Sequence, residues 1–140
     1  MVTDGQGTPL NVHVTPGQAH ESAALEEVVT ATRIGVRSRP ARIAGDKGYD
    51  IPRVRAYLRR RGIGVVIPEK AKPHGRKRGR PPVFDRDAYR RRNVVERTIG
   101  FLKHARRIAT RYEKTAVNFL AMLKLAMIQQ YFKHPLRDAT

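Results

Sequence analysis

The chain of 140 residues contains no cysteine and no tryptophan, and it has only 12 acidic residues against 29 Lys and Arg. The absence of cysteine excludes disulfide bonds, zinc sites with thiolate ligands and catalysis by a thiol, and it suits a reducing compartment. No apolar run approaches the roughly 18 residues that span a bilayer, and no charged-then-apolar leader opens the chain. The length suits one domain, and 40% hydrophobic residues are enough to build its core.

The shortage of acidic residues leaves a formal net charge of +17, and this charge is concentrated in one part of the chain. Residues 1–52 are close to neutral, whereas residues 53–111 hold 20 Lys and Arg and only 4 acidic residues. Within this block, residues 70–82 combine six cations with Gly and Pro, which indicates a flexible basic loop that orders against phosphate. The block predicts salt-dependent binding to nucleic acid, although solvated helix faces or a general basic nucleic-acid binder have the same composition.

The spacing of apolar residues predicts strands and helices in alternation, and therefore an α/β fold. A hairpin is expected first, then a helix, a strand, a helix, a strand and two longer helices. Their expected ranges are 1–15, 20–34, 41–46, 51–61, 63–67, 85–107 and 116–132.

Four polar side chains on the helix expected over 85–107 form the first candidate site. They are Tyr89, Arg92, Glu96 and Lys103. At about 100° per residue they fall within an arc of about 60°, beside an apolar stripe that would face the core. A lone carboxylate among cations at the edge of a buried stripe favours a metal-ligand site. An ordinary ion pair between Arg92 and Glu96, four residues apart, would explain the same spacing.

Asp46 is the second candidate, because it ends the strand expected over 41–46 and precedes Gly48, which allows a sharp exit. Ligands usually bind at the carboxyl ends of strands in α/β sheets. A turn-forming or helix-capping role is the alternative for Asp46, and Asp50 competes for that role as the cap of the following helix. Together, Asp46 and Glu96 suggest hard oxygen ligands for Mg²⁺ or Mn²⁺, which would activate water or a 3′-hydroxyl against a phosphodiester.

The four-residue face resembles the Tyr-x2-Arg-x3-Glu-x6-Lys signature of bacterial insertion-sequence transposases of the DDE class, and it matches every position. The segment Asp46-Lys47-Gly48-Tyr49 resembles the family's sequence around its second catalytic Asp. Residues 15–20 and 79–82 also resemble family sequence. The likeness extends over nearly the whole chain, from about Val2 to Phe132.

This resemblance implies an RNase H-like α/β fold with a mixed sheet flanked by helices and a basic loop before a long catalytic helix. It implies that Asp46 and Glu96 are catalytic residues that bind Mg²⁺ or Mn²⁺. The expected DNA-binding residues, from the signature and from the basic loop, are Tyr89, Arg92, Lys103, Arg76, Lys77, Arg78 and Arg80. The expected partners are double-stranded DNA and either further copies of the chain or a missing amino-terminal portion. The implied location is the bacterial cytoplasm at the nucleoid, with no membrane.

One family position has no counterpart in this chain. The family's first catalytic Asp lies on a central strand upstream of a segment like residues 1–15, so the fold is expected to lack its first strand. Asp4 stands in the turn of the predicted hairpin and is not expected to replace it. We therefore expect residues 1–140 to form a partial catalytic domain that binds DNA but cleaves it poorly alone. The alternative is a non-catalytic DNA-binding remnant or an inhibitor of transposition.

Overall fold

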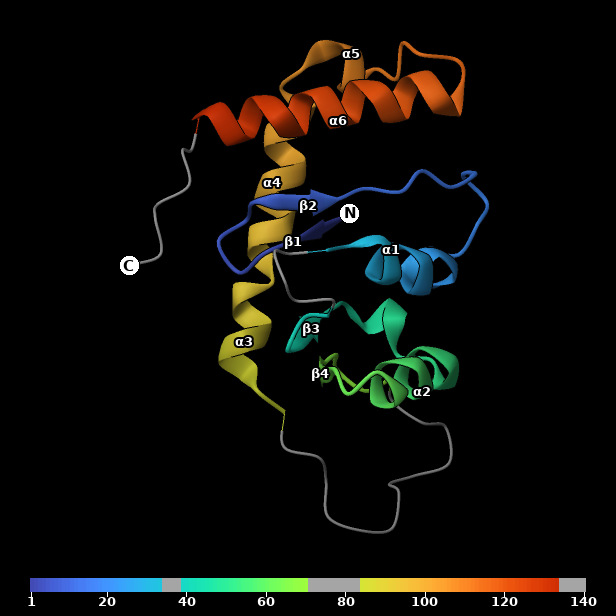
Figure 1. Cartoon of the computed structure of the whole chain (residues 1–140), viewed down its shortest axis with the longest axis vertical. Coiled ribbons are helices and arrows are strands. Elements are labelled where there is room, and N and C mark those ends of the chain that lie inside the picture. The colour runs from blue at the N-terminus through green and yellow to red at the C-terminus, as the bar shows by residue number, and fades with distance from the viewer. Residues whose placement is uncertain (34–38, 71–83, 134–140) are drawn as a thin grey trace, which may run out of the picture. The chain divides into compact units, whose positions relative to one another are not determined.

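The computed structural model describes residues 1–33, 39–70 and 84–133 (Figure 1). The chain divides into two compact units. One unit is Gln18–Arg92, and the other combines Met1–Gly17 with Asn93–Thr140. No helix in the described ranges has the length and apolar character needed to cross a membrane.

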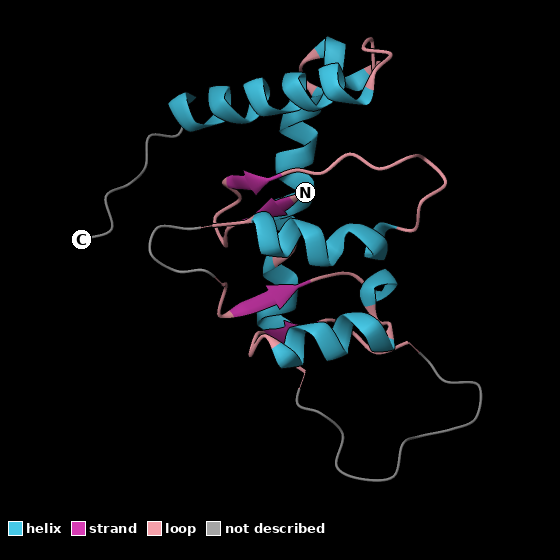
Figure 2. Ribbon diagram, turned by 45° about the vertical axis from the view of Figure 1, so that its right-hand side comes forward, coloured by secondary structure: helices cyan, strands magenta, loops and turns pink. Residues whose placement is uncertain are grey.

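The unit Gln18–Arg92 is built around a parallel pair of strands joined by a helix. β3 (Arg42–Ala44) pairs with β4 (Gly64–Val66) over three residues. The connecting helix α2 (Pro52–Arg60) packs against β4, as Figure 2 shows. This strand–helix–strand order confirms the predicted α/β character of the chain.

α2 carries most of the core of this unit. Its buried residues are spaced three and one apart, so they lie on one face of the helix. The core consists of Val29, Val54, Tyr57, Leu58, Ile63 and Ile67. The helix begins with Pro52, whose fixed φ suits a first turn, and Gly62 follows its end with φ of +63°.

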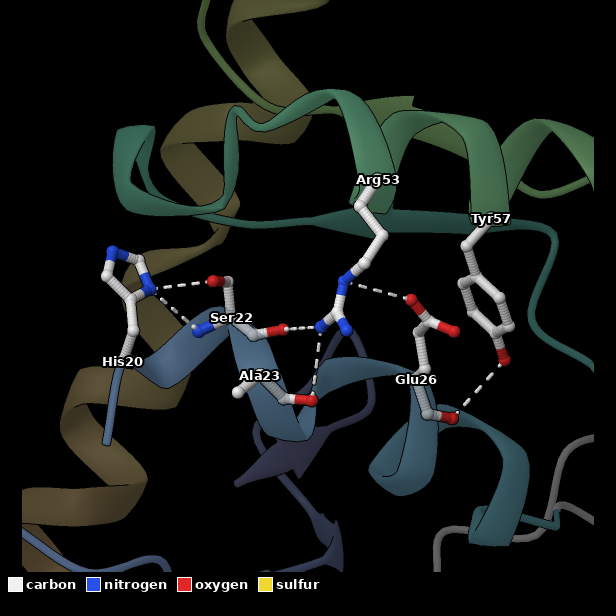
Figure 3. Close-up of polar contacts among 6 residues, drawn as sticks. All are labelled: His20, Ser22, Ala23, Glu26, Arg53 and Tyr57. Atoms are coloured by element: carbon white, nitrogen blue, oxygen red, sulfur yellow. Dashed lines mark hydrogen bonds and ion pairs between the residues drawn. The ribbon is translucent and has the colours of Figure 1, made fainter.

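Polar contacts hold the 3-10 helix η1 (Glu21–Ala24) and the following helix against α2 (Figure 3). The Arg53 guanidinium donates to the carbonyl oxygens of Ser22 and Ala23, at 3.3 Å each. The same group lies 3.3 Å from the Glu26 carboxylate. One arginine of α2 therefore satisfies two backbone carbonyls of η1 and pairs with a charge on the next helix.

Tyr57 adds a second connection between α2 and α1 (Leu25–Ala31). Its ring is buried in the core, and its hydroxyl lies 2.9 Å from Oγ1 of Thr30. The hydroxyl also lies 3.3 Å from the carbonyl oxygen of Glu26. The buried hydroxyl is thus hydrogen-bonded, which removes the penalty for its desolvation.

The second unit begins with the predicted hairpin. β1 (Val2–Thr3) pairs antiparallel with β2 (Pro9–Asn11). Asp4 holds the turn, because its Oδ1 accepts hydrogen bonds from the N–H groups of Gln6 and Thr8 at 2.8 Å each. The turn role predicted for Asp4 is therefore confirmed.

Three helices complete this unit: α4 (Asn93–Lys103), α5 (Arg106–Ala109) and α6 (Ala116–Lys133). α4 packs against β1, and the hydroxyl of Thr98 donates to the carbonyl oxygen of Gly7 at 2.6 Å. Buried apolar side chains from the three helices form the core. They are Leu102, Ile108, Leu123 and Met127.

A polar contact joins α6 to the hairpin. The Tyr131 hydroxyl donates to the carbonyl oxygen of Pro9 at 2.5 Å. Partial burial, with a smaller contribution from the charge of Asp4, raises the pKa of Tyr131, so the hydroxyl keeps its proton and remains a donor.

The sheet differs from the prediction. We expected one mixed sheet, but the described residues form two separate two-stranded sheets, one antiparallel and one parallel. Each ladder joins strands that are close in sequence, directly in the hairpin and through α2 in the parallel pair. Each two-stranded sheet therefore lies entirely within one unit.

The single helix predicted over 85–107 is wrong, because α3 (Arg86–Arg91), α4 and α5 replace it. Between α3 and α4, Arg92 keeps helical angles (φ −52°, ψ −28°), but its N–H bonds to carbonyls two and three residues earlier. That is a tighter turn than the α-helical pattern. Between α4 and α5, the backbone of Ala105 is extended (φ −71°, ψ 106°). Neither break contains Gly or Pro, so the usual sequence signals for a helix end are missing.

Replacing Leu58 with alanine is expected to destabilise the protein by about 2–5 kcal/mol, because this side chain is fully buried and would leave a cavity. Urea unfolding followed by circular dichroism measures the loss. Leu125→Ala removes the same atoms from a side chain of α6 that is 59% exposed, and it should cost less than about 0.5 kcal/mol. Equal losses from the two substitutions would contradict the core described above.

Candidate functional site

Asp46 lies two residues beyond the end of β3, at the carboxyl edge of the parallel pair. Its half-buried carboxylate caps the 3-10 helix η2 (Lys47–Tyr49), because Oδ1 accepts from the Gly48 N–H at 2.7 Å. Among the described residues, Oδ2 has no hydrogen-bond or ion-pair partner. The predicted place at a strand end is therefore confirmed, and so is the helix-capping alternative.

Two glycines shape the backbone around this carboxylate. A Cβ at Gly48 would lie 2.9 Å from Oδ1 of Asp46, closer than real Cβ atoms approach such a group. A Cβ at Gly45 would lie 3.3 Å from the ring of Tyr49 and 3.4 Å from Ile67. A side chain at Gly48 would displace the carboxylate, so this glycine allows the observed orientation of Asp46.

Asp50 does not cap α2, and that prediction is wrong. The N-cap residue is Ile51, which makes no side-chain capping bond. Asp50 instead accepts from Nε of Arg55 and from the backbone N–H of Lys70, at 2.5 Å each. Partial burial raises the pKa of Asp50, but these hydrogen bonds and the charges of Arg55 and Lys70 outweigh it and hold the pKa below its usual value. The Asp50 carboxylate thus joins α2 to Lys70, the first residue of the basic loop predicted over residues 70–82.

Two of the four signature residues contact each other around α3. The Tyr89 ring lies 5.3 Å from the ring of Phe84, and the guanidinium carbon of Arg92 lies 5.5 Å from the Tyr89 centroid. The second contact has the geometry of a cation–π interaction. In the same region, Asp85 pairs with Arg42 of β3 at 2.9 Å and so joins the start of α3 to the parallel strands.

The other two signature residues, Glu96 and Lys103, lie on the same face of α4. They are seven residues apart, which is about two turns or about 10 Å along the axis. Both side chains are exposed. Glu96 is in the first turn and Lys103 in the last, where the helix dipole favours each charge. Because the helix is interrupted at Arg92, these are the only two signature residues on one continuous helix.

The two predicted metal ligands belong to different units, Asp46 to Gln18–Arg92 and Glu96 to the other. Within the ranges that the structure describes, no three His, Asp or Glu side chains form a group that could hold a metal ion. Carboxylate oxygens are nevertheless suitable ligands for Mg²⁺ or Mn²⁺, and Asp46 has one oxygen uncommitted. Joint binding of one metal by these residues stays a prediction.

Part of the predicted DNA-binding set lies outside the described residues. It comprises Arg76, Lys77, Arg78 and Arg80. Conversely, sequence reasoning missed Phe84, Arg42 and the Asp50–Arg55 pair. Arg42 and its partner Asp85 are 43 residues apart in sequence, and no local pattern marks such a pair. The aromatic spacing of Phe84 and Tyr89 is the one signal that could have suggested their contact.

The chain belongs to the DDE transposase family, because residues 1–129 match the family described as the transposase DDE domain. It is similar to a candidate transposase for insertion sequence element IS402 of Burkholderia cepacia, with 36% identity over 131 residues. That match covers 89% of this chain and 57% of the relative, so the chain spans little more than half of that protein. A candidate transposase for insertion sequence element IS6501 of Brucella ovis is 29% identical over 125 residues, which cover 89% of both chains. No solved structure matches the chain.

This membership confirms the family expected from the signature.

Asp50→Asn is expected to lower stability by about 1–3 kcal/mol at neutral pH, because it removes the acceptor charge from a hydrogen-bonded Arg55. The pKa of Asp50 is lowered in the folded state, so the stabilisation is complete above the unfolded value of about 3.9 and is lost as pH falls through the folded value. The difference between wild type and variant should therefore shrink below about pH 4. Urea unfolding at a series of pH values measures it.

Asp87→Asn is the matched control for this experiment. Its side chain is 79% exposed, and its nearest cation is Arg90 at 3.8 Å. The change should cost less than about 0.5 kcal/mol at every pH. A loss for Asp50→Asn that persists unchanged in acid would show that the carboxylate charge is not what stabilises this contact.

Proposed function

We propose that this chain contributes part of the catalytic centre of an insertion-sequence transposase that cleaves and transfers DNA strands in a metal-dependent reaction. The observation that carries the proposal is the position of Asp46, at the carboxyl edge of a parallel strand pair in a chain that belongs to the DDE transposase family. The β3–α2–β4 arrangement supports placing this part of the chain within an RNase H-like fold.

In this proposal Asp46 and Glu96 are the metal ligands of the chain. The uncommitted oxygen of Asp46 and the exposed carboxylate of Glu96 support that role, because Mg²⁺ and Mn²⁺ prefer such oxygens. The metal ion, when bound, would supply Lewis-acid activation of water or of a 3′-hydroxyl. The capping bond from the Gly48 N–H would keep the Asp46 carboxylate in one orientation.

The cationic residues bind the DNA backbone in this proposal. The contact with the Tyr89 ring holds the Arg92 guanidinium in a defined position, and a guanidinium matches the geometry of a phosphate. Lys103 would bind a phosphate from the same helix face as Glu96. The basic block over residues 53–111 would add sequence-independent affinity through counterion release.

We further propose that the 140-residue polypeptide needs a third carboxylate from another polypeptide segment. We do not assign this role to Asp4, because it is the residue that holds the hairpin turn, with its Oδ1 accepting two backbone hydrogen bonds. This observation favours the second candidate function, in which the polypeptide alone binds DNA without cleaving it and acts as an inhibitor of transposition.

Asp46→Asn and Glu96→Gln are each expected to weaken Mn²⁺ binding roughly tenfold or more, because each removes a charged metal ligand. DNA affinity without metal should stay equal or rise, since each change removes a negative charge from a surface that binds phosphate. Titration calorimetry with Mn²⁺ and fluorescence anisotropy with a labelled duplex measure the two quantities.

The control for these variants is again Asp87→Asn, an exposed carboxylate of α3 outside the proposed site. It should leave Mn²⁺ affinity unchanged. If all three variants bind Mn²⁺ like the wild type, the proposed metal site is wrong, and the chain is a general basic nucleic-acid binder.

Incubated with Mg²⁺ and a labelled DNA duplex carrying an element end, the 140-residue polypeptide is expected to shift the duplex but to nick it little above background. The shift should weaken steeply with salt, because the affinity comes mainly from phosphate contacts. A gel-shift series over salt concentration and a denaturing gel measure binding and nicking on the same samples. Efficient nicking that is abolished by Asp46→Asn would contradict the need for a third carboxylate.

A further inference from the structure

A histidine and a buried serine form a polar pair at the start of η1, outside the residues used above (Figure 3). Nδ1 of His20 lies 2.6 Å from Oγ of Ser22 and accepts a hydrogen bond from the Ser22 backbone N–H at 3.3 Å. His20 is exposed, whereas Ser22 is only 4% exposed. The imidazole is therefore open to solvent, while its contact with the buried Ser22 fixes its position.

This geometry determines where the imidazole carries its proton. A backbone N–H can only donate, so Nδ1 must be the acceptor and must be unprotonated. The ring hydrogen then lies on Nε2, and the Ser22 hydroxyl, 2.6 Å from Nδ1, is placed to donate to the same atom. Among the described residues, Nε2 has no partner. His20 thus offers solvent one N–H donor in a fixed direction.

The pair stands on a rigid support that also carries Asp46. Arg53 of α2 binds the carbonyl oxygens of Ser22 and of the next residue, which holds η1 against that helix. η1 also packs against η2, the element that Asp46 caps. In Figure 3 the imidazole lies beside the teal segment that includes η2. The donor and the proposed metal ligand therefore belong to neighbouring elements of one unit.

We propose that His20 is a DNA-contact residue, whose Nε2–H donates to a phosphate oxygen of the strand bound at the Asp46 edge, and that Ser22 is its positioning residue. The proposal rests on the proposed function, since it places DNA at this edge. An anionic oxygen is the acceptor that a free N–H donor on a strongly basic chain would meet. In this tautomer Nε2 carries the hydrogen and has no lone pair for a metal ion, so a phosphate oxygen fits it better than a metal does.

A hydrolytic Ser–His pair does not fit either. A nucleophilic serine must reach its substrate, and Ser22 is buried. Its hydroxyl instead fixes the tautomer and the orientation of the ring. Held in this way, a donor loses little conformational freedom on binding DNA.

The test compares DNA affinities of variants in the full 140-residue chain, with a short fluorescein-labelled duplex as the probe and Ca²⁺ as the metal. His20→Asn keeps an oxygen that can accept from the Ser22 N–H, because Asn is a good N-cap residue, but it removes the imidazole donor. The expected result is a loss of affinity of roughly 5- to 10-fold with an unchanged melting temperature. Ser22→Ala should lower affinity in the same direction by a smaller factor.

The salt dependence separates a neutral donor from a cationic contact. His20→Asn should leave the slope of log K against log salt unchanged, whereas Lys103→Gln should reduce its magnitude by about 0.9. The matched control is His13→Asn, the same change in the segment between β2 and η1, which should leave affinity unchanged. A slope altered by His20→Asn, or an equal loss from His13→Asn, would overturn the assignment of a neutral donor at His20.

The remaining outcomes separate this inference from the proposed function. If the wild type binds the duplex and Asp46→Asn weakens Mn²⁺ binding, but His20→Asn binds DNA normally, the His20 contact is wrong and the proposed function stands. If the wild type does not bind the duplex at all, both are wrong. If His20→Asn lowers the melting temperature together with affinity, restored affinity in His20→Gln, which can again place a donor, supports the contact, and no restoration overturns it.

Discussion

The parallel pairing of β3 with β4, closed by α2, is the constraint on which the proposed site depends. α2 buries Val54 and Leu58 completely, and this packing keeps β4 in register with β3. Asp46 follows the end of β3 and therefore lies at the carboxyl edge of the parallel pair, where η2 begins. Without the apolar contacts of α2, a ladder of three residue pairs would be too short to hold its edge in place.

Side chains that bind distant backbone carbonyls supplement the small apolar cores of both units. In one unit, Thr98 and Tyr131 bind carbonyl oxygens of the hairpin, 91 and 122 residues away in sequence. In the other, Arg53 binds η1 and Arg55 binds the carbonyl oxygen of Ile67 at 3.0 Å. Buried carbonyls left without donors would be costly, so each of these bonds stabilises one arrangement of segments.

These internal arginine contacts also mean that the net charge is not a count of the cations open to a ligand. Several cations of the basic block, among them Arg53 and Arg55, are engaged inside the protein. Arg92 also makes an internal contact, because its guanidinium lies over the Tyr89 ring. The total of +17 therefore overstates the number of cations that remain available to a ligand.

Turn residues and apolar spacing act over a few neighbouring residues, so they were enough to predict the hairpin with its Asp4 turn and the strand–helix–strand order around α2. The family was predicted from the resemblance of the four-residue signature. The interruption of the helix at Arg92 was beyond such reasoning, since its backbone angles remain helical and no Gly or Pro marks it. The contacts of Asp50 and the surroundings of His20 were equally hidden. Asp50 accepts from the N–H of Lys70, 20 residues away in sequence. η1, which His20 caps, contacts α2 and η2, and only this packing brings these segments together.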